Sequence, residues 1–288
     1  MVREFEKLVE FIELSNLYQD LAEETLESIN FDSSPTDNHK QILFFIYLEN
    51  SLDSLAQNTY QIFEKELDKS ELWQHFQGIE IETPKNIFDE EIINLMDFNC
   101  DQKKDVHFFY TLPFSKNRAL IETTWLSNLE DQSLRDYDLQ LENYIENNLG
   151  IKNYKINFTE KGAIPLFSPS LRNNNNIINI GSAGGMTRLS TGYTFLNIQE
   201  HSRYILKNID NIDKAKIFSL GKKYQFLDKV FLRVLEKHPE KMPKIFFNMF
   251  RTSSNTIIKF LSNKSNMIED INIISKMPKL IFLKALFN

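Results

Sequence analysis

The spacing of apolar side chains predicts a helical beginning, a middle rich in strands and a helical end for this chain. Near the N-terminus, apolar residues recur at helical intervals and acidic residues fill the opposite face. The apolar positions of this amphipathic helix are Phe5, Leu8, Val9, Ile12, Leu17 and Leu21. Residues 32–38 have the composition of a loop, whereas the apolar run 42–48 fits either a buried strand or part of a helix.

From residue 71 onward, the pattern changes to runs rich in aromatic and β-branched residues, which are typical of strands. Strands are predicted at residues 73–83, 106–112, 119–126, 154–158 and 163–166. Pro84 ends the first of them. Residues 115–117 join the second and third strands, so these two are predicted to pair as an antiparallel hairpin. The last two strands lie on either side of Lys161 and Gly162.

Helical spacing returns at residues 137–149, where Gly150 provides a C-terminal cap, and again at residues 194–209. Three further apolar stripes, divided by prolines, predict helices beyond residue 209. The stripes are Phe226, Val230, Phe231, Val234 and Leu235, then Ile245, Phe246, Met249 and Phe250, then Ile257, Ile258 and Leu261, and the prolines are Pro239, Pro243 and Pro278. The predicted fold is therefore α+β or α/β, with an antiparallel sheet and a helical C-terminal region.

A glycine-rich stretch precedes the C-terminal helices. The polar loop 173–176 and the apolar run 177–180 lead into Gly181, Gly184 and Gly185, three of the eight glycines of the chain. This order predicts a strand, a tight turn and a helix, and the backbone N–H groups of such a turn can bind a phosphate or the edge of an isoalloxazine ring. The spacing differs from G-x-G-x-x-G, so the alternative is a turn that serves only close packing between strand and helix.

One acidic residue, Glu122, lies inside a predicted strand that is otherwise apolar or β-branched. Alternation places Leu120, Glu122 and Thr124 on the same face of this strand. A carboxyl group surrounded by apolar side chains stays protonated near neutral pH, because its charged form is disfavoured, and it can then donate a proton. The alternative is a solvated glutamate on the outer face of an antiparallel sheet.

Composition excludes several classes of function. The net charge is −7 and no basic stripe is interleaved with aromatic residues, which argues against nucleic-acid binding. A single cysteine, Cys100, excludes an internal disulfide and a zinc site built from cysteines, and it favours a reducing compartment. No metal site is predicted. No apolar run has the length of a membrane span, and the acidic N-terminal segment is unlike a signal or transit peptide.

Charge is distributed unevenly along the chain. Residues 1–70 carry 15 acidic and 5 basic side chains, whereas residues 237–288 carry 9 basic and 3 acidic ones. In the basic region, positive and apolar residues are interleaved as in an amphipathic surface that rests on anionic lipid. They are Lys241, Lys244, Arg251, Lys259 and Lys264 with Phe246, Phe247, Phe250, Ile257, Ile258 and Leu261. The alternative is a helical subdomain packed on the sheet, with solvated lysines.

Four sequence blocks, taken in order, resemble the lycopene cyclases of carotenoid biosynthesis. They are Q-H-F-Q-G at 74–78 with L-M-D-F at 95–98, L-P-F-S-K-N-R-A-L-I-E-T-T at 112–124, G-A-I-P at 162–165, and G-S-A-G-G at 181–185 with S-T-G-Y at 190–193. The four blocks in this order are a more specific signal than any one of them. The resemblance covers about residues 71–288, because the helical end is also similar to that of bacterial members.

The resemblance implies a flavoprotein related to the two-domain FAD monooxygenases, which uses reduced FAD without net redox change and NAD(P)H as its reductant. In this family a protonated carboxyl group adds a proton to the terminal double bond of lycopene or a related linear carotene. A neighbouring double bond then attacks the carbocation, and loss of a proton completes a β-ionone ring. Such an isomerase works in the cytoplasm as a peripheral membrane protein.

The resemblance also implies roles for individual residues. Glu122 matches the acidic motif and would be the proton donor. Phe114, Trp125 and Tyr193 would line the path of the cation, because aromatic faces attract positive charge; the alternative is that they are ordinary core residues. The flavin would contact Gly181, Ser182, Ala183, Gly184, Gly185, Thr191, Gly192 and Tyr193.

The chain departs from the family pattern at two places. Thr123 stands where a second acidic residue commonly follows the catalytic glutamate, and no glycine precedes Gly78, although the family opens with G-x-G-x-x-G for the ADP half of FAD. We therefore expect a truncated two-domain flavoprotein with poor affinity for FAD. Residues 1–70 would form an acidic helical segment, residues 71–215 the sheet core with the catalytic hairpin and flavin turn, and residues 216–288 a basic helical region.

Two alternatives to a carotenoid cyclase stay open at this point. One is a non-catalytic remnant or lipid-binding module, which would carry no flavin. The other is a different FAD-dependent oxidoreductase of the same fold, such as a reductase or halogenase, which would oxidise nicotinamide with another substrate.

Overall fold

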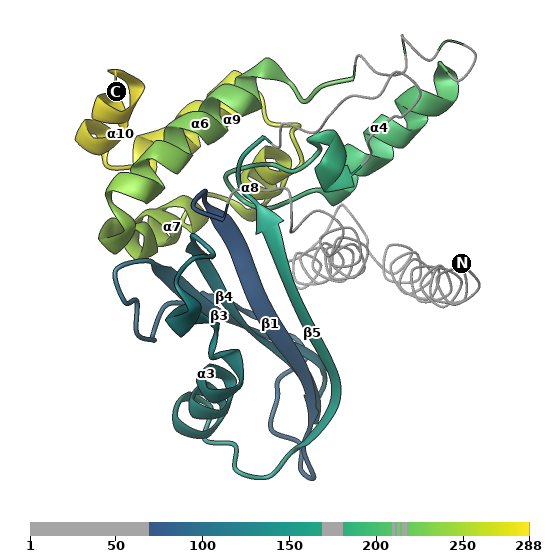
Figure 1. Cartoon of the computed structure of the whole chain (residues 1–288), viewed down its shortest axis with the longest axis vertical. Coiled ribbons are helices and arrows are strands. Elements are labelled where there is room, and N and C mark those ends of the chain that lie inside the picture. The colour runs from purple at the N-terminus through teal and green to yellow at the C-terminus, as the bar shows by residue number, and fades with distance from the viewer. Residues whose placement is uncertain (1–68, 169–180, 209–210, 212–213, 215–217, 288) are drawn as a thin grey trace.

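The computed structural model describes residues 69–168, 181–208, 211, 214 and 218–287 (Figure 1). Several predicted elements lie outside the described residues. They are the amphipathic N-terminal helix, the loop 32–38, the apolar run 42–48, the loop 173–176 and the strand 177–180. The expected boundaries at residues 70 and 215 stay a prediction.

A five-stranded antiparallel sheet, in the order β2-β3-β4-β1-β5, forms the centre of the described structure. Its strands are β1 (Trp73–Glu82), β2 (Asn94–Asp97), β3 (Val106–Ser115), β4 (Arg118–Ser127) and β5 (Lys155–Pro165). The predicted hairpin is confirmed, because β3 pairs with β4 across a loop of Lys116 and Asn117. The short strand β2 has no counterpart among the predicted strands, because it is too short to show a period.

The prediction of two strands on either side of Lys161 and Gly162 is wrong. The structure has one continuous strand, β5, which pairs with β1 from Trp73↔Pro165 to Glu82↔Lys155. A shift of register between Glu80 and Ile81 absorbs an extra residue of β5. The glycine therefore does not mark a turn, because pairing along the whole of β1 satisfies the backbone of β5 through this position.

One face of the sheet packs against α3 (Tyr137–Asn143) and the short π-helix η2 (Tyr144–Asn148). We call it the α3 face. Its core contains Ile79, Ile81, Phe109 and Ile121 of the strands with Leu141, Tyr144 and Ile145 of the helices. The predicted helix at 137–149 is confirmed in position, and Gly150 follows it with a φ of 71°, as a C-terminal cap requires.

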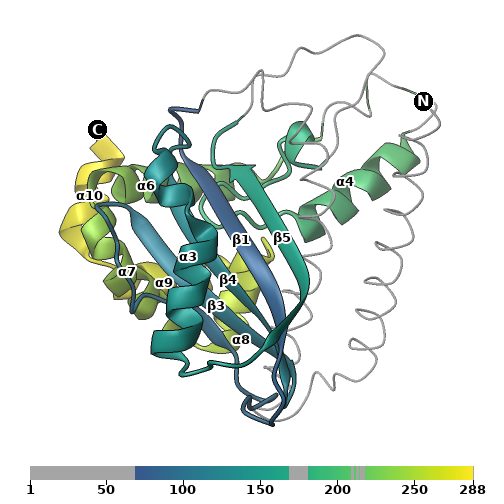
Figure 2. The same ribbon diagram turned by 60° about the horizontal axis from the view of Figure 1, so that its bottom comes forward.

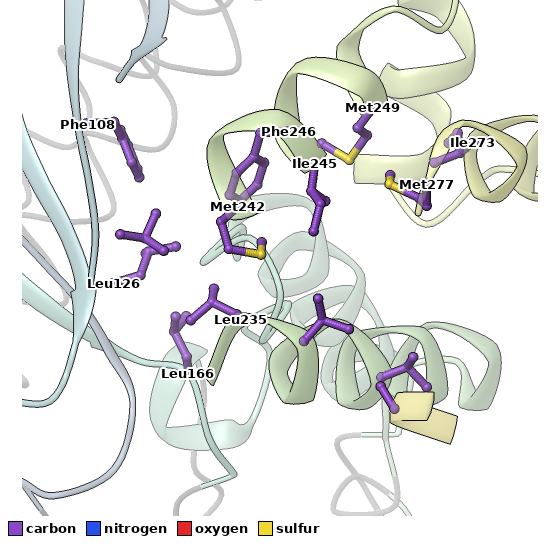
Figure 3. Close-up of a cluster of buried hydrophobic side chains, with 14 of the residues drawn as sticks. Phe108, Leu126, Leu166, Leu235, Met242, Ile245, Phe246, Met249, Ile273 and Met277 are labelled. Carbon is purple, nitrogen blue, oxygen red and sulfur yellow. The ribbon is translucent and has the colours of Figure 1, made fainter. Parts of the chain in front are cut away.

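The opposite face of the sheet packs against the helical C-terminal region, and we call it the α7 face. The helices are α6 (Lys222–Lys237), α7 (Met242–Phe250), α8 (Ser254–Leu261), α9 (Met267–Lys276) and α10 (Lys279–Phe287). Phe108 and Leu126 of the sheet share one buried cluster with Leu235, Met242 and Phe246 of the helices (Figure 3). The three predicted stripes are thus confirmed as helices, and the apolar area that they remove from water is what holds this region on the sheet.

The sheet is therefore a central layer with helices on both sides. Figure 2 shows α3 in front of β1 and β4, with α7, α8 and α9 behind them. The antiparallel sheet and the helical C-terminal region of the predicted fold are confirmed. None of the helices in the described part of the chain combines the length and the hydrophobicity that crossing a membrane requires.

Candidate active site

Glu122 lies in the middle of β4, on the α7 face, and its side chain is only 5% exposed. Its neighbours in the ladder are Tyr110 of β3 and Gly78 of β1. The hydroxyl Oγ1 of Thr124 donates a hydrogen bond of 2.5 Å to Oε1 of Glu122. A solvated position for Glu122 is wrong, because helices cover both faces of the sheet and every residue of β4 after Arg118 is buried.

A second carboxyl group, that of Glu160 in β5, lies on the same face of the sheet as Glu122, with β1 between the two strands. Gly78 pairs with Glu122 on one side and with Glu160 on the other. A Cβ added at Gly78 would lie 2.9 Å from Oε1 of Glu160 and 3.2 Å from Cδ1 of Leu120. Glu160 is 6% exposed, no described residue donates a hydrogen bond to its Oε1, and burial raises the pKa of this carboxyl to about 7.

The α3 face carries a separate polar network around two buried histidines. His75 contacts the hydroxyls of Tyr137 at 2.6 Å and Ser127 at 2.7 Å through its two ring nitrogens. His107 contacts the backbone oxygen of Asp101 at 2.9 Å and Oγ1 of Thr123 at 2.8 Å. Burial lowers the pKa of His75 to about 3 and that of His107 to about 4. Both side chains are therefore neutral at physiological pH.

The structure does not bring Trp125 or Phe114 to Glu122. Trp125 is on the α3 face, where its ring stacks on His107 at 3.8 Å and its Nε1 donates to Oε1 of Gln140 at 3.0 Å. This is the position of a core aromatic, which is the alternative that the sequence left open. Phe114 lies at the register shift beside the β3–β4 loop, about 13 Å along β3 from Tyr110, the neighbour of Glu122.

The segment from Arg188 to Tyr193 forms a tight turn on the α7 face. The amide of Arg188 donates to the oxygen of Tyr193 at 2.8 Å, and the amide of Gly192 donates to the oxygen of Arg188 at 2.8 Å. Gly192 has a φ of 72°, and a Cβ at this position would collide with the side-chain amide of Gln74 in β1. Glycine therefore lets this turn rest on the face of the sheet that carries Glu122 without backbone strain and without displacing Gln74.

A buried ion pair anchors this turn to α6. Arg188 is fully buried and donates from Nη2 to Oδ1 of Asp228 at 2.7 Å and from Nε to Oδ2 at 2.9 Å. The hydroxyl of Ser190 donates to the same Oδ1 at 2.7 Å, and Nη1 of Arg188 donates to the backbone oxygen of Phe260 at 3.1 Å. The sequence reasoning missed both charged residues, although Asp228 stands on an otherwise apolar stripe of α6 four residues after the buried Tyr224.

The glycine segment forms the short 3-10 helix η3 (Gly181–Gly184), which precedes α4 (Phe195–Lys207). Gly181 and Gly185 have φ values of 61° and 72°. A Cβ at Gly185 would meet no described atom within 4 Å, and one at Gly181 would make ordinary contact with Ile198 at 3.6 Å. Positive φ, not close packing, is thus the reason for glycine at these two positions.

Among the described residues, cavities border the turn and the glycine segment. A cavity of about 540 Å³ is bordered by Ser182, Gly185 and Thr187 and also by charged side chains of α6. An apolar cavity of about 200 Å³ lies between the α7 face and helices α7 and α8, and its walls include Gln74, Phe108, Tyr110, Thr191 and Tyr193. A second apolar cavity, of about 540 Å³, shares Ser190, Thr191, Phe246 and Met249 with it and extends to α9 and α10.

The predicted site residues therefore fall into two groups. Glu122 and Tyr193 both belong to the α7 face, and the smaller apolar cavity is lined by Tyr193 and by Tyr110, the neighbour of Glu122 in the ladder. The predicted flavin contacts are divided between two cavities. Ser182 and Gly185 border the cavity that also has charged side chains of α6 in its wall, whereas Thr191 and Tyr193 border the smaller apolar cavity.

The chain is similar to a known protein family over most of its length. Residues 54–286 match the family model described as "Lycopene cyclase protein". The chain belongs to the lycopene cyclase family. The match spans the five strands, the glycine segment and the C-terminal helices, and it contains all four sequence blocks. The family prediction is confirmed.

Other comparisons add little to the lycopene cyclase assignment. No curated protein matches the chain. A solved structure of a geranylgeranyl bacteriochlorophyll reductase-like protein from Thermoplasma acidophilum is similar at 14% sequence identity, with a TM-score of 0.46. The similarity covers 76% of this chain and 55% of that protein, so this chain spans about half the length of that protein.

Proposed function

We propose that this protein cyclises the end of a linear carotene by acid catalysis, with Glu122 as the proton donor. The observation that carries this proposal is the position of Glu122: a buried carboxyl group in the matching family motif, whose neighbour in the ladder, Tyr110, lines an apolar cavity. A buried carboxyl in apolar surroundings is the side chain that can hold a proton at neutral pH and release it to carbon.

The reaction is an isomerisation in three steps. The hydroxyl of Thr124 donates to Oε1 of Glu122, and the acid proton of this carboxyl is added to the terminal double bond. The carbocation that forms is attacked by a neighbouring double bond, which closes a six-membered ring. A proton is then lost from the carbon next to the cation and returns to the carboxylate, so that no atoms or electrons are gained or lost overall.

The two apolar cavities suit a carotene chain. Apolar and aromatic side chains form most of their walls, and both cavities contact Thr191 and Met249. Tyr110 and Tyr193 contribute aromatic rings to the smaller cavity, and such rings attract a developing positive charge. Trp125 has no part in this path, because it lies on the α3 face.

The residues fit the ring end of a flavin better than its nucleotide end. Ser182, Gly185 and Thr187 border a cavity whose volume, about 540 Å³, lies in the range of about 300–1,000 Å³ typical of small-molecule sites. Nothing comparable to G-x-G-x-x-G is present in the chain for the ADP half. Reduced FAD, when bound, supplies an electron-rich ring without net redox change, and NAD(P)H would reduce it.

A peripheral membrane position belongs to the same proposal, because a carotene dissolves in the bilayer. Phe246 and Ile257 of the predicted lipid-contacting surface are buried, and Lys259 pairs with Glu269 at 2.7 Å. Phe247 and Phe250 of the same surface are exposed. Further exposed apolar side chains lie on α9 and α10. They are Met267, Ile268, Ile271, Ile274, Leu280, Leu283, Leu286 and Phe287, with Lys276, Lys279 and Lys284 among them.

Expression of the chain in a bacterial host that accumulates lycopene tests the proposal. We expect cyclised carotene from the wild-type chain and only lycopene from Glu122→Gln, because the amide cannot donate the proton to carbon. Pigments are separated by liquid chromatography. Glu80→Gln is the matched control: Glu80 lies on the same face two residues beyond Gly78, where it pairs with Arg118 at 2.6 Å.

Two results would contradict the proposal. Cyclisation that persists in the folded Glu122→Gln protein would exclude Glu122 as the acid. Lycopene unchanged by a folded wild-type chain supplied with reduced FAD would favour the alternatives, a lipid-binding module or another flavin enzyme.

A further inference from the structure

A buried side-chain amide on the α7 face has no hydrogen-bond partner among the described residues. It belongs to Gln74 of β1, which is 7% exposed and forms part of the wall of the smaller apolar cavity. No described residue donates a hydrogen bond to its oxygen or accepts one from its nitrogen. An amide that is removed from water and left without partners destabilises a folded protein. A molecule bound in the cavity can supply these partners.

Gly192 brings the turn from Arg188 to Tyr193 against this amide. Cδ and Nε2 of Gln74 lie 3.1 Å and 3.5 Å from the position that a Cβ of Gly192 would take. The hydroxyl of Thr191, the preceding residue, accepts a hydrogen bond from the backbone amide of Tyr193 at 3.3 Å, and that of Ser190 donates to the buried ion pair at 2.7 Å. The hydroxyls of the turn are thus directed elsewhere, and the amide of Gln74 keeps its donor and its acceptor for a ligand.

The amide lies where two cavities meet. The cavity of about 540 Å³ beside the glycine segment and the smaller apolar cavity both contact Leu166. Leu166 belongs to the same buried cluster as Leu126, the partner of Gln74 in the ladder of β1 and β4 (Figure 3). The turn also passes from one cavity to the other, since Thr187 borders the first and Thr191 the second. A flat molecule in the cavity beside the glycine segment can therefore reach Gln74 with one edge.

The chemistry of a carboxamide indicates which edge it binds. Its oxygen accepts a hydrogen bond and its nitrogen donates one alongside, so a ligand that carries an N–H next to a carbonyl satisfies both at once, much as glutamine pairs with the edge of adenine. A hydroxyl group would satisfy only one of them.

We propose that Gln74 binds the pyrimidine edge of the flavin ring, where N3–H lies between two carbonyl groups. Oε1 of Gln74 accepts the hydrogen bond from N3–H, and Nε2 donates to the adjacent carbonyl. This inference rests on the proposed function for the identity of the cofactor. The pairing itself is a property of binding and does not require that cyclisation occurs.

Binding of riboflavin and of 3-methylriboflavin to the full-length protein, measured by flavin fluorescence anisotropy, tests the pairing. The methyl group removes the N3–H donor from an otherwise unchanged ring. We expect the wild-type chain to bind riboflavin roughly tenfold more tightly, because the methylated ring leaves the buried amide without its partner. In Gln74→Leu the affinity for riboflavin should fall about tenfold, and the difference between the two flavins should disappear.

Gln225→Leu is the matched control. Gln225 borders the cavity beside the glycine segment, but its Nε2 already donates to the backbone oxygen of Leu220 at 2.7 Å. The ratio of the two affinities should therefore equal that of the wild type. Circular dichroism identifies the variants that fold.

The carbonyl stretching bands of bound riboflavin, recorded by infrared difference spectroscopy, provide a readout that a merely structural role of Gln74 would not move. A hydrogen bond to a carbonyl oxygen lowers its stretching frequency. We expect the lowered band in the wild type and in Gln225→Leu, and its return to higher frequency in Gln74→Leu.

The outcomes separate this inference from the proposed function. Equal affinity of the wild type for the two flavins, no binding of riboflavin by the folded wild type, or discrimination that persists in folded Gln74→Leu overturns the pairing even in an active cyclase. Discrimination that depends on Gln74 in a chain that forms no cyclised carotene supports the pairing and rejects the proposed function. Such discrimination together with cyclisation supports both.

Discussion

At the scale of single residues, burial changes the pKa of three side chains of the sheet with opposite effects on stability. Burial raises the pKa of Glu160 to about 7, and it lowers that of His75 to about 3 and that of His107 to about 4. The folded protein holds the proton of Glu160 more tightly than the unfolded chain does, whereas it resists protonation of the histidines. Glu160 therefore contributes stability at low pH, and the histidines contribute it above a pH of about 6.5.

The contribution of Glu160 gives a pH-dependent prediction. It is fully present below the ordinary carboxyl pKa of 4.5 and is lost as pH rises through about 7. In Glu160→Gln this loss is absent. Between pH 4.5 and about 7, the free energy of unfolding of the variant should therefore decrease by on the order of 3 kcal/mol less than that of the wild type. Urea unfolding at a series of pH values measures the difference.

Glu80, which lies on the same face of the sheet as Glu160 and pairs with Arg118, provides the control for this pH dependence of stability. Glu80→Gln should leave the slope of stability against pH close to that of the wild type. Equal slopes for wild type and Glu160→Gln between pH 4.5 and 7 would mean that Glu160 is ionised as easily in the folded protein as in the unfolded chain.

At the scale of elements, the turn from Arg188 to Tyr193 joins the sheet to the helical region. It rests on Gln74 of β1 through Gly192, and the pair of Arg188 with Asp228 ties it to α6. Removing one partner of such a buried pair commonly costs about 3–5 kcal/mol, because the other charge is left without compensation. The turn therefore holds Thr191 and Tyr193 at the wall of the apolar cavity.

Gly192→Ala and Gly185→Ala form a matched pair that tests the contact with the sheet. Both glycines have a φ of 72°, so alanine costs each position about 1–2 kcal/mol in backbone strain. Only at Gly192 does the added Cβ also collide with Gln74. We expect Gly192→Ala to be less stable than Gly185→Ala by about 1–3 kcal/mol, measured by chemical denaturation.

Gln74→Ala provides the reciprocal control, because it removes the side chain with which the Cβ collides. In that background the difference between the two alanine variants should disappear. Equal stability of the two variants in the wild-type background would show that the turn or the side chain of Gln74 moves aside without cost.

At the scale of the whole molecule, the cavities connect the interior of the protein with an exposed apolar surface. The larger apolar cavity is bordered by Phe231 and Met249 inside and by Ile271, Ile274 and Leu283, which are exposed on α9 and α10. Helix α10 buries only Ala285, which is unusual for a helix of such apolar composition. A bilayer that covered α9 and α10 would place dissolved carotene next to this cavity.

Binding to vesicles tests this surface. We expect the wild-type chain to sediment with vesicles containing anionic lipid and the triple variant Ile268→Ser, Ile271→Ser, Leu280→Ser to bind at least tenfold more weakly, because burial of each such side chain contributes about 1.5–3 kcal/mol. Leu139→Ser, at an exposed apolar position of α3 on the other face, is the control. Equal binding of all three proteins would exclude α9 and α10 as the lipid-contacting surface.

Much of the fold follows from local pattern, because strands and helices depend on neighbours close in the sequence. Alternation and turn residues determined the hairpin of β3 and β4, and helical spacing determined α3, α6, α7 and α8. The same alternation places Glu122 and Trp125 on opposite faces of the sheet, because the two are three residues apart in one strand. Glu122 itself was marked by the family motif and by its apolar neighbours.

Only the tertiary structure decided which distant residues share a surface. The sequence by itself indicates a carboxyl in a strand, but burial of Glu122 depends on what packs on the α7 face of the sheet. Glu160 shares a row of the ladder with Glu122 only because β1 lies between β4 and β5, and its carboxyl has room over β1 because that row carries Gly78. Arg188 and Asp228 are 40 residues apart, and a pairing over such a distance leaves no periodic pattern in the sequence. Contacts of this kind depend on strand order and helix packing, which many positions determine together.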